Sequence, residues 1–206
     1  MNLWNDFRKV VKFIDDNQTW LRPLMDRVAA NEKSRGEIDY LDMRSAFIDF
    51  QPECFNDLVA IYTLCCCGLL EYLKDFIGRK NNRQMYDALH SILEESYGFP
   101  IYQEQIMLIS QKVARFSKGE SDVLRKALTK KHLARIKEFR GKFIKGGMLQ
   151  GYDVEMLEKI WDEILIFAPY AFNKSHAVAY TWISYCMGYL KVYFPHEYNT
   201  KYYEQI

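Results

Sequence analysis

Hydrophobic positions recur along most of the chain at intervals of three or four residues, with short polar breaks between the periodic stretches. This spacing places apolar side chains on one face of an α-helix. Strand-like alternation is rare, and glycine and proline, which interrupt helices, number only 10 and 5. We therefore predict a mainly α protein with no large sheet. The predicted helices cover 4–14, 18–31, 55–77, 84–97, 102–115, 121–145, 153–167 and 175–194.

Residues that favour helix ends mark several of these boundaries. Ser121 can cap the first turn of 121–145, because a serine side chain accepts hydrogen bonds from free backbone amides. The pair Gly146-Gly147 is expected to end the same helix. Asp153 and Asn173 are expected to cap the two helices that follow.

The composition is that of a soluble globular protein, with 49% hydrophobic and 27% charged residues among 206. The longest uncharged apolar runs, 58–70 and 177–190, are shorter than the roughly 20 residues of a spanning helix. The N-terminal residues lack the pattern of a secretory signal. Five cysteines, three of them adjacent, fit neither a disulfide framework nor a zinc site. We therefore expect a cytoplasmic protein with reduced thiols and no membrane partner.

Positive charge is concentrated between Arg125 and Lys145. Nine Lys or Arg residues lie there with only Glu138 opposing them, so this segment carries +8 whereas the whole chain carries +1. On one continuous helix, its cations would form a ridge about 80° wide and its apolar side chains the opposite face. The ridge would contain Lys126, Lys130, Lys137 and Arg140, and the apolar face Leu128, Ile136, Phe139 and Phe143.

Three interpretations of this basic segment are open. It can be an ordinary solvated surface helix. It can bind phosphates, because spaced cations neutralise them and release counterions. It can also lie on an anionic membrane, but no tryptophan flanks the basic face and the apolar side is needed for a core.

A series of short motifs follows in a fixed order that resembles one known family. The motifs are FNDLVAI (55–61), GLLEYLKDFIGRK (68–80), SYGFPIYQEQIML (96–108), SKGESDVLRKALTKK (117–131), VEMLEKIWDEILIFAPYAFNKSHAVAYTWISY (154–185) and YLKVYFPHEY (189–198). Together they resemble the segment of the bacterial DNA polymerase III alpha subunit that runs from the end of the palm into the fingers. YQEQIM and AFNKSHA are the most specific pieces. We accordingly divide the chain into an N-terminal helical segment of unknown affinity, 1–42, and a fingers-like helical domain, 43–206.

This resemblance implies nucleotidyl transfer in DNA replication, in which palm carboxylates hold two Mg²⁺ ions and the fingers offer cations to the incoming triphosphate and template. Asp57 resembles the third metal-site aspartate of the family. Arg125 and Lys126 match the basic pair that faces the triphosphate. Further residues are similar to phosphate-facing groups: Arg79, Lys80, Lys130, Lys131, Lys174 and His176.

The polar residues of the two most specific motifs have two interpretations each. Gln103 and Glu104 are either surface groups or part of the polar lining near the nucleotide. Asn173 either caps the following helix or, with Ser175, joins that lining. His176 either hydrogen-bonds within the protein or, with Lys174, meets phosphate or template. The N-terminus of the helix predicted to begin there favours anions, which supports contact of this motif with phosphate.

The chain also departs from the family pattern. The PDxDxDF-like motif that carries the paired palm aspartates is missing, and Glu37-Ile38-Asp39 is only a distant imitation. One carboxylate cannot hold two metals. The family's YRPGP is replaced by CCCGL at 65–69, which would extend a helix from Leu58 toward Phe76 and bury the cysteines as small hydrophobes. Thr129 replaces a turn glycine, so we expect the helix to run through it.

We therefore predict a fingers fragment that contacts phosphates, nucleotide and template and is inactive alone. Its expected partners are DNA, dNTP phosphates and a palm-bearing polymerase chain. Mg²⁺ is implied by the family but is not expected to bind stably to this chain alone. The alternative is a non-catalytic helical scaffold or interaction protein. Retention of Arg125, Lys126 and Lys174 favours the first hypothesis, and loss of the YRPGP-like loop favours the second.

Overall fold

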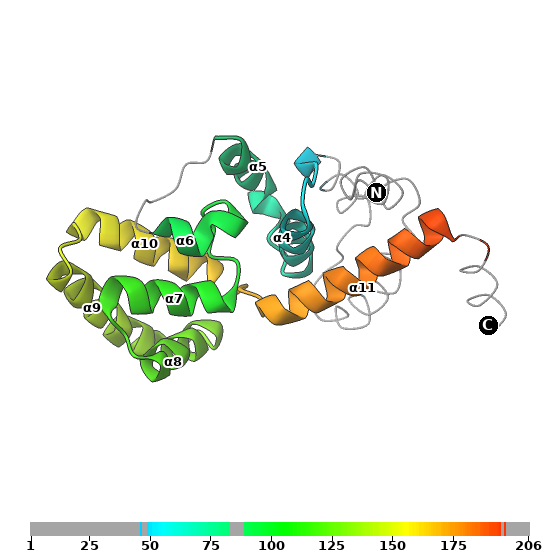
Figure 1. The fold of residues 1–206 in the computed structure, drawn as a ribbon. Coiled ribbons are helices and arrows are strands. Elements are labelled where there is room, and N and C mark those ends of the chain that lie inside the picture. Colours follow the sequence, from blue (N-terminus) through cyan, green and yellow to red (C-terminus); the bar gives the residue numbers. More distant parts are fainter. Residues whose placement is uncertain (1–45, 47–48, 83–88, 195, 197–206) are drawn as a thin grey trace. The chain divides into compact units, whose positions relative to one another are not determined.

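A computed structural model describes residues 46, 49–82, 89–194 and 196, and these residues form helices and the turns and loops that connect them, with no strand among them (Figure 1). This confirms the predicted mainly α fold. The α-helices are α4 (Phe55–Cys66), α5 (Leu73–Asn82), α6 (His90–Leu93), α7 (Gln103–Ala114), α8 (Lys118–Thr129), α9 (Leu133–Leu149), α10 (Val154–Phe167) and α11 (Lys174–Tyr193). Two short 3₁₀ turns, η1 (Leu70–Tyr72) and η3 (Glu94–Ser96), lie between them.

The chain forms two compact units. One comprises Met1–Leu70 with His176–Ile206, and the other comprises Glu71–Ser175. We call them the terminal unit and the central unit. The predicted boundary between 1–42 and 43–206 lies outside the described residues and stays a prediction. The predicted helices 4–14 and 18–31 lie outside them as well.

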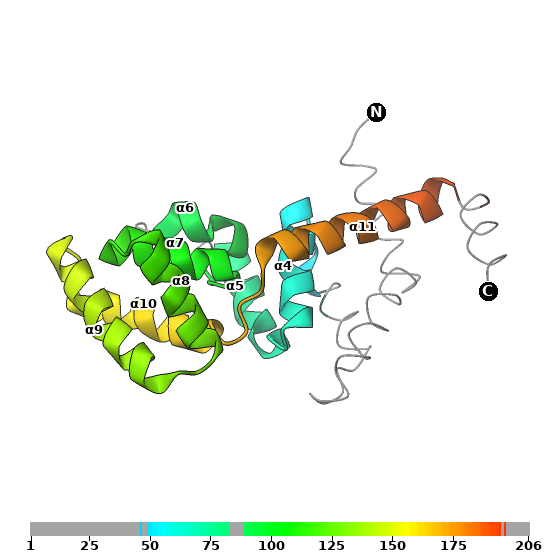
Figure 2. The ribbon, with the colours of Figure 1, turned by 90° about the horizontal axis from the view of Figure 1, so that it is seen from below.

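The central unit is built around α7, α8, α9 and α10. Helix α7 contacts α8 and α9, and α9 in turn contacts α8 and α10, a grouping that is visible from both directions in Figures 1 and 2. The apolar faces of these helices form one core, in which Trp161 and Phe143 are completely buried with ring centres 5.3 Å apart. Leu128, Phe139 and Phe143 are buried as the periodicity predicted, whereas Ile136 is only partly buried.

Three predicted helices of the central and C-terminal sequence are confirmed. The prediction 102–115 corresponds to α7, 153–167 to α10, and 175–194 to α11. Asp153 caps α10 as expected, because its carboxylate accepts the amides of Glu155 at 2.9 Å and Met156 at 3.2 Å. Only the second half of 84–97 is described, and it forms α6 and η3.

The prediction of one helix over 55–77 is wrong, because the chain turns after Cys66. Gly68 adopts a left-handed conformation, with φ of 70°, and the amide of Leu69 donates to the carbonyl of Leu64 at 3.0 Å. This bond closes the last turn of α4 in the manner of a Schellman motif. The apolar residues that replace the YRPGP-like segment therefore do not extend the helix toward Phe76, since Gly68 ends it. Cys65 is buried, but Cys66 and Cys67 are only partly buried.

The prediction of one helix over 121–145 is also wrong. Helix α8 begins earlier, at Lys118, and its cap is Ser117 rather than Ser121: the Ser117 hydroxyl accepts the amide of Glu120 at 3.2 Å, and the Glu120 carboxylate accepts the amide of Ser117 at 2.9 Å. Such a reciprocal capping box satisfies two free amides. Ser121 is buried instead, and its hydroxyl accepts a hydrogen bond from Gln111.

The same segment is interrupted a second time near Lys131, which adopts φ of 53°. The amides of Lys131 and His132 donate back to the carbonyls of Leu128 and Ala127 at 3.0 and 2.9 Å. The helix therefore does not run straight through Thr129, as predicted from the missing glycine. A lysine two positions later takes the left-handed conformation that ends α8.

The prediction that the pair Gly146-Gly147 ends this helix is wrong, because both glycines lie within α9. A side chain on Gly146 would overlap the backbone of Ala114, at the end of α7, and one on Gly147 would overlap Leu157 of α10. The glycines therefore permit close packing of α9 against both helices. The turn that follows α9 contains Gly151 instead, with φ of 85°.

The terminal unit contains α4 and most of α11. Every residue of α4 from Asp57 to Cys65 is buried, including the polar Thr63, whose hydroxyl donates to the Val59 carbonyl at 2.8 Å. Phe55 packs edge-on against Trp182 and Tyr185 of α11 at 5.7 and 6.4 Å between ring centres. No helix in the described part of the chain combines the length and apolarity needed to cross a bilayer.

Candidate phosphate-binding site

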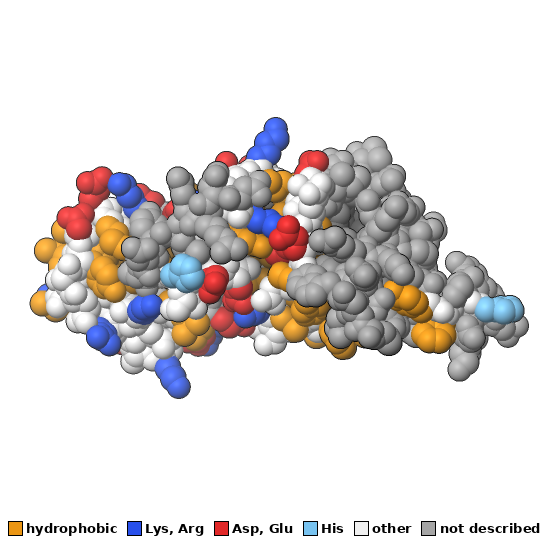
Figure 3. Space-filling view, turned by 45° about the horizontal axis from the view of Figure 1, so that its top comes forward, with side chains coloured by type: hydrophobic (Ala, Val, Ile, Leu, Met, Phe, Trp, Pro, Cys, Tyr) orange, Lys and Arg blue, Asp and Glu red, His pale blue; other side chains and the backbone are white. Residues whose placement is uncertain are grey.

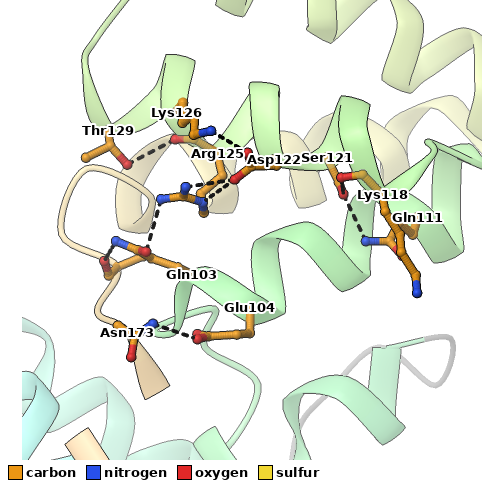
Figure 4. A network of polar contacts seen from close by, with 11 residues as sticks. Gln103, Glu104, Gln111, Lys118, Ser121, Asp122, Arg125, Lys126, Thr129 and Asn173 are labelled. Carbon is orange, nitrogen blue, oxygen red and sulfur yellow. Dashed lines mark hydrogen bonds and ion pairs between the residues drawn. The ribbon is translucent and has the colours of Figure 1, made fainter. Parts of the chain in front are cut away.

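Arg125, on the third turn of α8, is held on two sides (Figure 4). Its Nε and Nη2 groups donate to Oδ1 of Asp122 at 3.1 and 2.7 Å, and its Nη1 group donates to Oε1 of Gln103 at 3.1 Å. A guanidinium group carries five N–H bonds. Three of the five N–H bonds of Arg125 have acceptors, which hold the group in a defined orientation. The other two N–H bonds have no acceptor among the described residues.

Gln103 is itself fixed at the start of α7. Its side-chain amide donates to the carbonyl of Ala171 at 3.0 Å, and its backbone amide donates to the carbonyl of Phe172 at 2.9 Å. The second of these bonds belongs to an isolated parallel bridge between Tyr102 and Phe172. Gln103 thus joins α7 to the segment that precedes α11, and Arg125 joins α8 to Gln103.

Lys126 shares the same carboxylate. Its Nζ lies 2.6 Å from Oδ2 of Asp122, while Arg125 occupies Oδ1. Hydrogen bonds from Lys126 and then Arg125 lower the pKa of the Asp122 carboxyl below its ordinary value. The side chain of Lys126 is 58% exposed and that of Arg125 only 22%. Lys126 is therefore a solvent-facing cation, and Arg125 a constrained one.

Lys130 and Lys131, at the end of α8, are exposed, and their side chains make no hydrogen bond or ion pair with a described residue. The same is true of four more cations of α8 and α9. These are Lys118, Arg135, Lys137 and Lys145. Two others are paired: Arg140 donates to Glu158 at 2.6 Å, and Lys142 lies 2.8 Å from Glu138.

The predicted single cationic ridge is wrong in its geometry. The turn at Lys131 leaves Lys126 on α8 and Lys130 at its C-cap, but places Lys137 and Arg140 on α9, so one helical periodicity does not align them. On the face drawn in Figure 3, Lys and Arg side chains stand apart from one another, several next to acidic groups. The unpaired charges near the α8–α9 turn are the remaining candidates for phosphate contact.

Arg79, near the end of α5, has several structural contacts. It donates to the carbonyl of Gly98 at 3.2 Å and to Glu163 at 3.1 Å, and its guanidinium lies 3.9 Å from the ring centre of Phe99. Lys80 follows it in the last turn of α5 and is partly exposed. The predicted role of Arg79 in phosphate contact would require it to act while these bonds are in place.

The start of α11 already has a carboxylate from α7. Glu104 accepts the backbone amide of Lys174 and the side-chain amide of Asn173, each at 3.1 Å. The Lys174 ammonium lies 2.5 Å from Glu95 and 5.8 Å from the ring centre of Tyr102. The sequence predicted that the positive end of this helix attracts an anion, and the Glu104 carboxylate takes that place. The anion observed there is therefore part of the protein and not a phosphate.

Ser175 and His176 of the AFNKSHA motif are exposed. Ser175 closes the central unit, and His176 opens the second part of the terminal unit. The His176 ring lies 4.3 Å from that of Tyr180, one turn further along α11. The proposed roles of both residues stay predictions.

Asp57 lies in the first turn of α4 and is 1% exposed. Its carboxylate accepts the backbone amide of Glu53, which precedes the N-cap residue of the helix, at 2.7 Å. Among the described residues, no three His, Cys, Asp or Glu side chains gather closely enough to hold a metal ion. The described part of the chain therefore does not fit the Mg²⁺ pair that the family implies.

Sequence reasoning missed Asp122 and Gln105. Asp122 could have been found, because acidic residues three and four positions before Arg125 and Lys126 face them on a helix. Gln105 is buried and donates to the Ser96 hydroxyl at 2.6 Å, while its carbonyl accepts the Tyr102 amide at 3.0 Å. Only the packing of η3 against α7 shows that this glutamine supports the fold.

Comparison with known proteins gives a consistent result. A family model of the bacterial DNA polymerase III alpha subunit finger domain matches residues 22–151. The DNA polymerase III subunit alpha of Staphylococcus epidermidis is 45% identical over 158 residues, which are 75% of this chain and 15% of that protein. The Mycobacterium leprae protein of the same name is 42% identical over 193 residues, 85% of this chain and 16% of its own length. The Aquifex aeolicus protein of that name is 37% identical over 168 residues, which are 79% of this chain and 14% of that protein.

Proposed function

The chain belongs to the bacterial DNA polymerase III alpha subunit family through its finger domain, and we propose that it binds phosphate groups of DNA and nucleotides as a fingers module. It spans about 15% of the length of the Staphylococcus epidermidis relative. Polymerisation itself is therefore proposed only for an assembly in which a palm-bearing chain supplies the metal-binding carboxylates, at DNA in the bacterial cytoplasm.

The observation that carries this proposal is the state of the cations on α8. Among the described residues, two N–H bonds of the firmly held Arg125 have no acceptor, and the exposed Lys130 and Lys131 have no acidic neighbour at hydrogen-bonding distance. A phosphate accepts several such donors, and a planar guanidinium matches its oxygens well. A merely solvated helix would not require an arginine held by residues from two helices.

Binding to duplex DNA should be sequence-independent and weakened by salt. Each neutralised phosphate contributes about −0.9 to the slope of log K against log salt, so contacts from two to four cations predict a slope of roughly −2 to −4. Fluorescence anisotropy of a labelled duplex from about 50 to 200 mM salt measures this slope.

A charge-matched pair of variants tests which lysines take part. Replacing Lys130 and Lys131 with Ala should make the slope shallower by about two. Replacing Lys142 and Lys159, which lie 2.8 Å from Glu138 and Glu155, removes the same charge from paired positions and should change it less. Equal effects of the two double variants would show that only net charge matters, and the proposed site would be wrong.

A second function, that of a helical scaffold, is favoured by one observation. Arg79, Arg140 and Lys174 are each engaged by acidic groups within the central unit, as expected of cations that maintain a fold. If no salt-dependent DNA binding is found at about 50 mM salt, the scaffold explanation stands and the fingers function does not. We expect no extension of a primed template by the isolated chain in either case, because the PDxDxDF-like motif is missing.

A further inference from the structure

We propose that Asp122 and Gln103 are positioning residues, which hold the Arg125 guanidinium in the orientation that receives a phosphate group. This inference rests on the proposed function, and it names the residues that orient Arg125, the central cation of the proposed site. Asp122 lies on α8 with Arg125, and Gln103 lies at the start of α7, so the hold comes from two helices (Figure 4).

The bonds around Arg125 restrict every nitrogen of its guanidinium group. Asp122 accepts from Nε and Nη2 through the same oxygen, and Gln103 accepts from Nη1. An arginine that must bind from a free state loses the freedom of several torsions, whereas one already held loses little. The two N–H bonds that remain can therefore meet phosphate at small entropic cost.

Gln103 could not fix Arg125 if it moved freely itself. Its amide nitrogen is bound to the Ala171 carbonyl, which leaves its oxygen directed to Arg125. This arrangement also determines which end of the amide accepts, because only the oxygen can take the arginine proton. The position of Arg125 thus depends on the start of α7 and on the segment before α11.

Asp122 carries out this role without cancelling the charge of the site. Its second oxygen pairs with Lys126, so one carboxylate opposes two cations and leaves a net charge of about +1. Lys126 is largely exposed, and its flexible ammonium can turn from Asp122 to a phosphate. Arg125 would meanwhile keep its hold on Asp122 and Gln103.

Positioning and simple charge predict opposite results for one substitution. Asp122→Asn removes a negative charge beside two cations, so charge alone predicts tighter binding to DNA. If Asp122 positions Arg125, the weaker hold of an uncharged amide oxygen should instead weaken binding by about three- to tenfold, the difference between a charge-assisted and a neutral hydrogen bond. Asp122→Glu keeps the charge but moves the carboxylate, and we expect it to weaken binding as well.

A double-mutant cycle separates positioning from a general effect on the fold. The full chain, Asp122→Asn, Arg125→Gln and the double variant are compared by anisotropy with a labelled duplex and by competition with inorganic tripolyphosphate. In the wild-type background, we expect Asp122→Asn to weaken binding of both the duplex and tripolyphosphate. Once Arg125 is replaced, we expect Asp122→Asn to leave binding of both ligands unchanged or to tighten it. Glu138→Gln removes the carboxylate paired with Lys142 and is the matched control, which should not weaken binding.

The possible results are distinct. Tighter binding by Asp122→Asn in the wild-type background, or unchanged binding by Asp122→Glu, would overturn the positioning role and leave the proposed function standing. Equal weakening in both backgrounds would show that Asp122 acts through the fold, not through Arg125, and would also overturn it. Absence of salt-dependent binding by the unaltered chain would overturn both the positioning role and the proposed function.

Discussion

Gly146 lies so close to the end of α7 that a Cβ on it would overlap the backbone oxygen of Ala114 and come within 3.1 Å of the Ala114 Cα and carbonyl carbon. A glycine inside a helix is normally unfavourable by about 0.5–1 kcal/mol relative to alanine. The close approach of α9 to α7 depends on this residue, because backbone atoms cannot move aside as a flexible side chain can.

We predict that Gly146→Ala lowers the free energy of unfolding by about 1–3 kcal/mol, the usual cost of overpacking. Gly141, an exposed residue of the same helix, has no atom within 4 Å of an added Cβ. Gly141→Ala should therefore raise stability by about 0.5–1 kcal/mol. Urea unfolding monitored by circular dichroism compares the two. A gain in both variants would show that α7 and α9 do not approach as described.

The left-handed conformation of Lys131 leads to a second prediction. A side chain in this conformation costs about 1 kcal/mol, and glycine does not incur that cost. Lys131→Gly should therefore raise the free energy of unfolding by up to about 1 kcal/mol. Lys130, its neighbour, has φ of −85°, so Lys130→Gly should be destabilising instead. Thermal melts of the two variants should move in opposite directions, and a shift of the same sign would contradict the turn.

The capping box of α8 gives a third prediction. Ser117→Ala should destabilise the chain by about 1 kcal/mol, because it leaves the Glu120 amide without its acceptor. Thermal unfolding of Ser117→Ala and the unaltered chain at neutral pH measures this loss. No loss would favour a helix that starts at Ser121, as the sequence alone suggested.

Glu120, which forms the capping box with Ser117, should make the stability of the fold depend on pH. Hydrogen bonds from the Ser117 amide and then its hydroxyl lower the pKa of the Glu120 carboxyl. A carboxyl with a lowered pKa in the folded state stabilises the fold above its unfolded pKa of about 4.3, and this contribution disappears as pH falls through the folded value. Glu120→Gln should therefore be less stable than the unaltered chain near neutral pH and equal to it in acid. Urea titrations across this range test the prediction, and a difference independent of pH would contradict it.

Arg79 provides the last prediction, which separates its predicted phosphate role from its structural contacts. Arg79→Met should lower stability by about 1–2 kcal/mol, because it removes charge-assisted hydrogen bonds to Gly98 and Glu163 and the contact with Phe99. Salt-dependent DNA binding should change little if these contacts occupy the guanidinium. Weaker binding with unchanged thermal stability would instead support the phosphate role of Arg79.

The sequence by itself determined the helical class and the family. Helices such as α7 and α10 follow from apolar periodicity, which depends only on the sequence spacing of side chains. The cap at Asp153 was equally predictable, since its amide partners lie two and three residues away. The family followed from motifs such as YQEQIM, and the match of residues 22–151 to the finger-domain model confirms it.

Tertiary structure decided where the helices stop and which cations stay unpaired. Gly68 and Gly146 are the same residue type, yet one turns the chain after α4 and the other lies within α9 against Ala114. Local sequence cannot separate these uses, because the second depends on a neighbour 32 positions away. In the same way, Arg125 is held by Gln103, 22 residues earlier in the chain, and only the packing of α7 against α8 brings the two together.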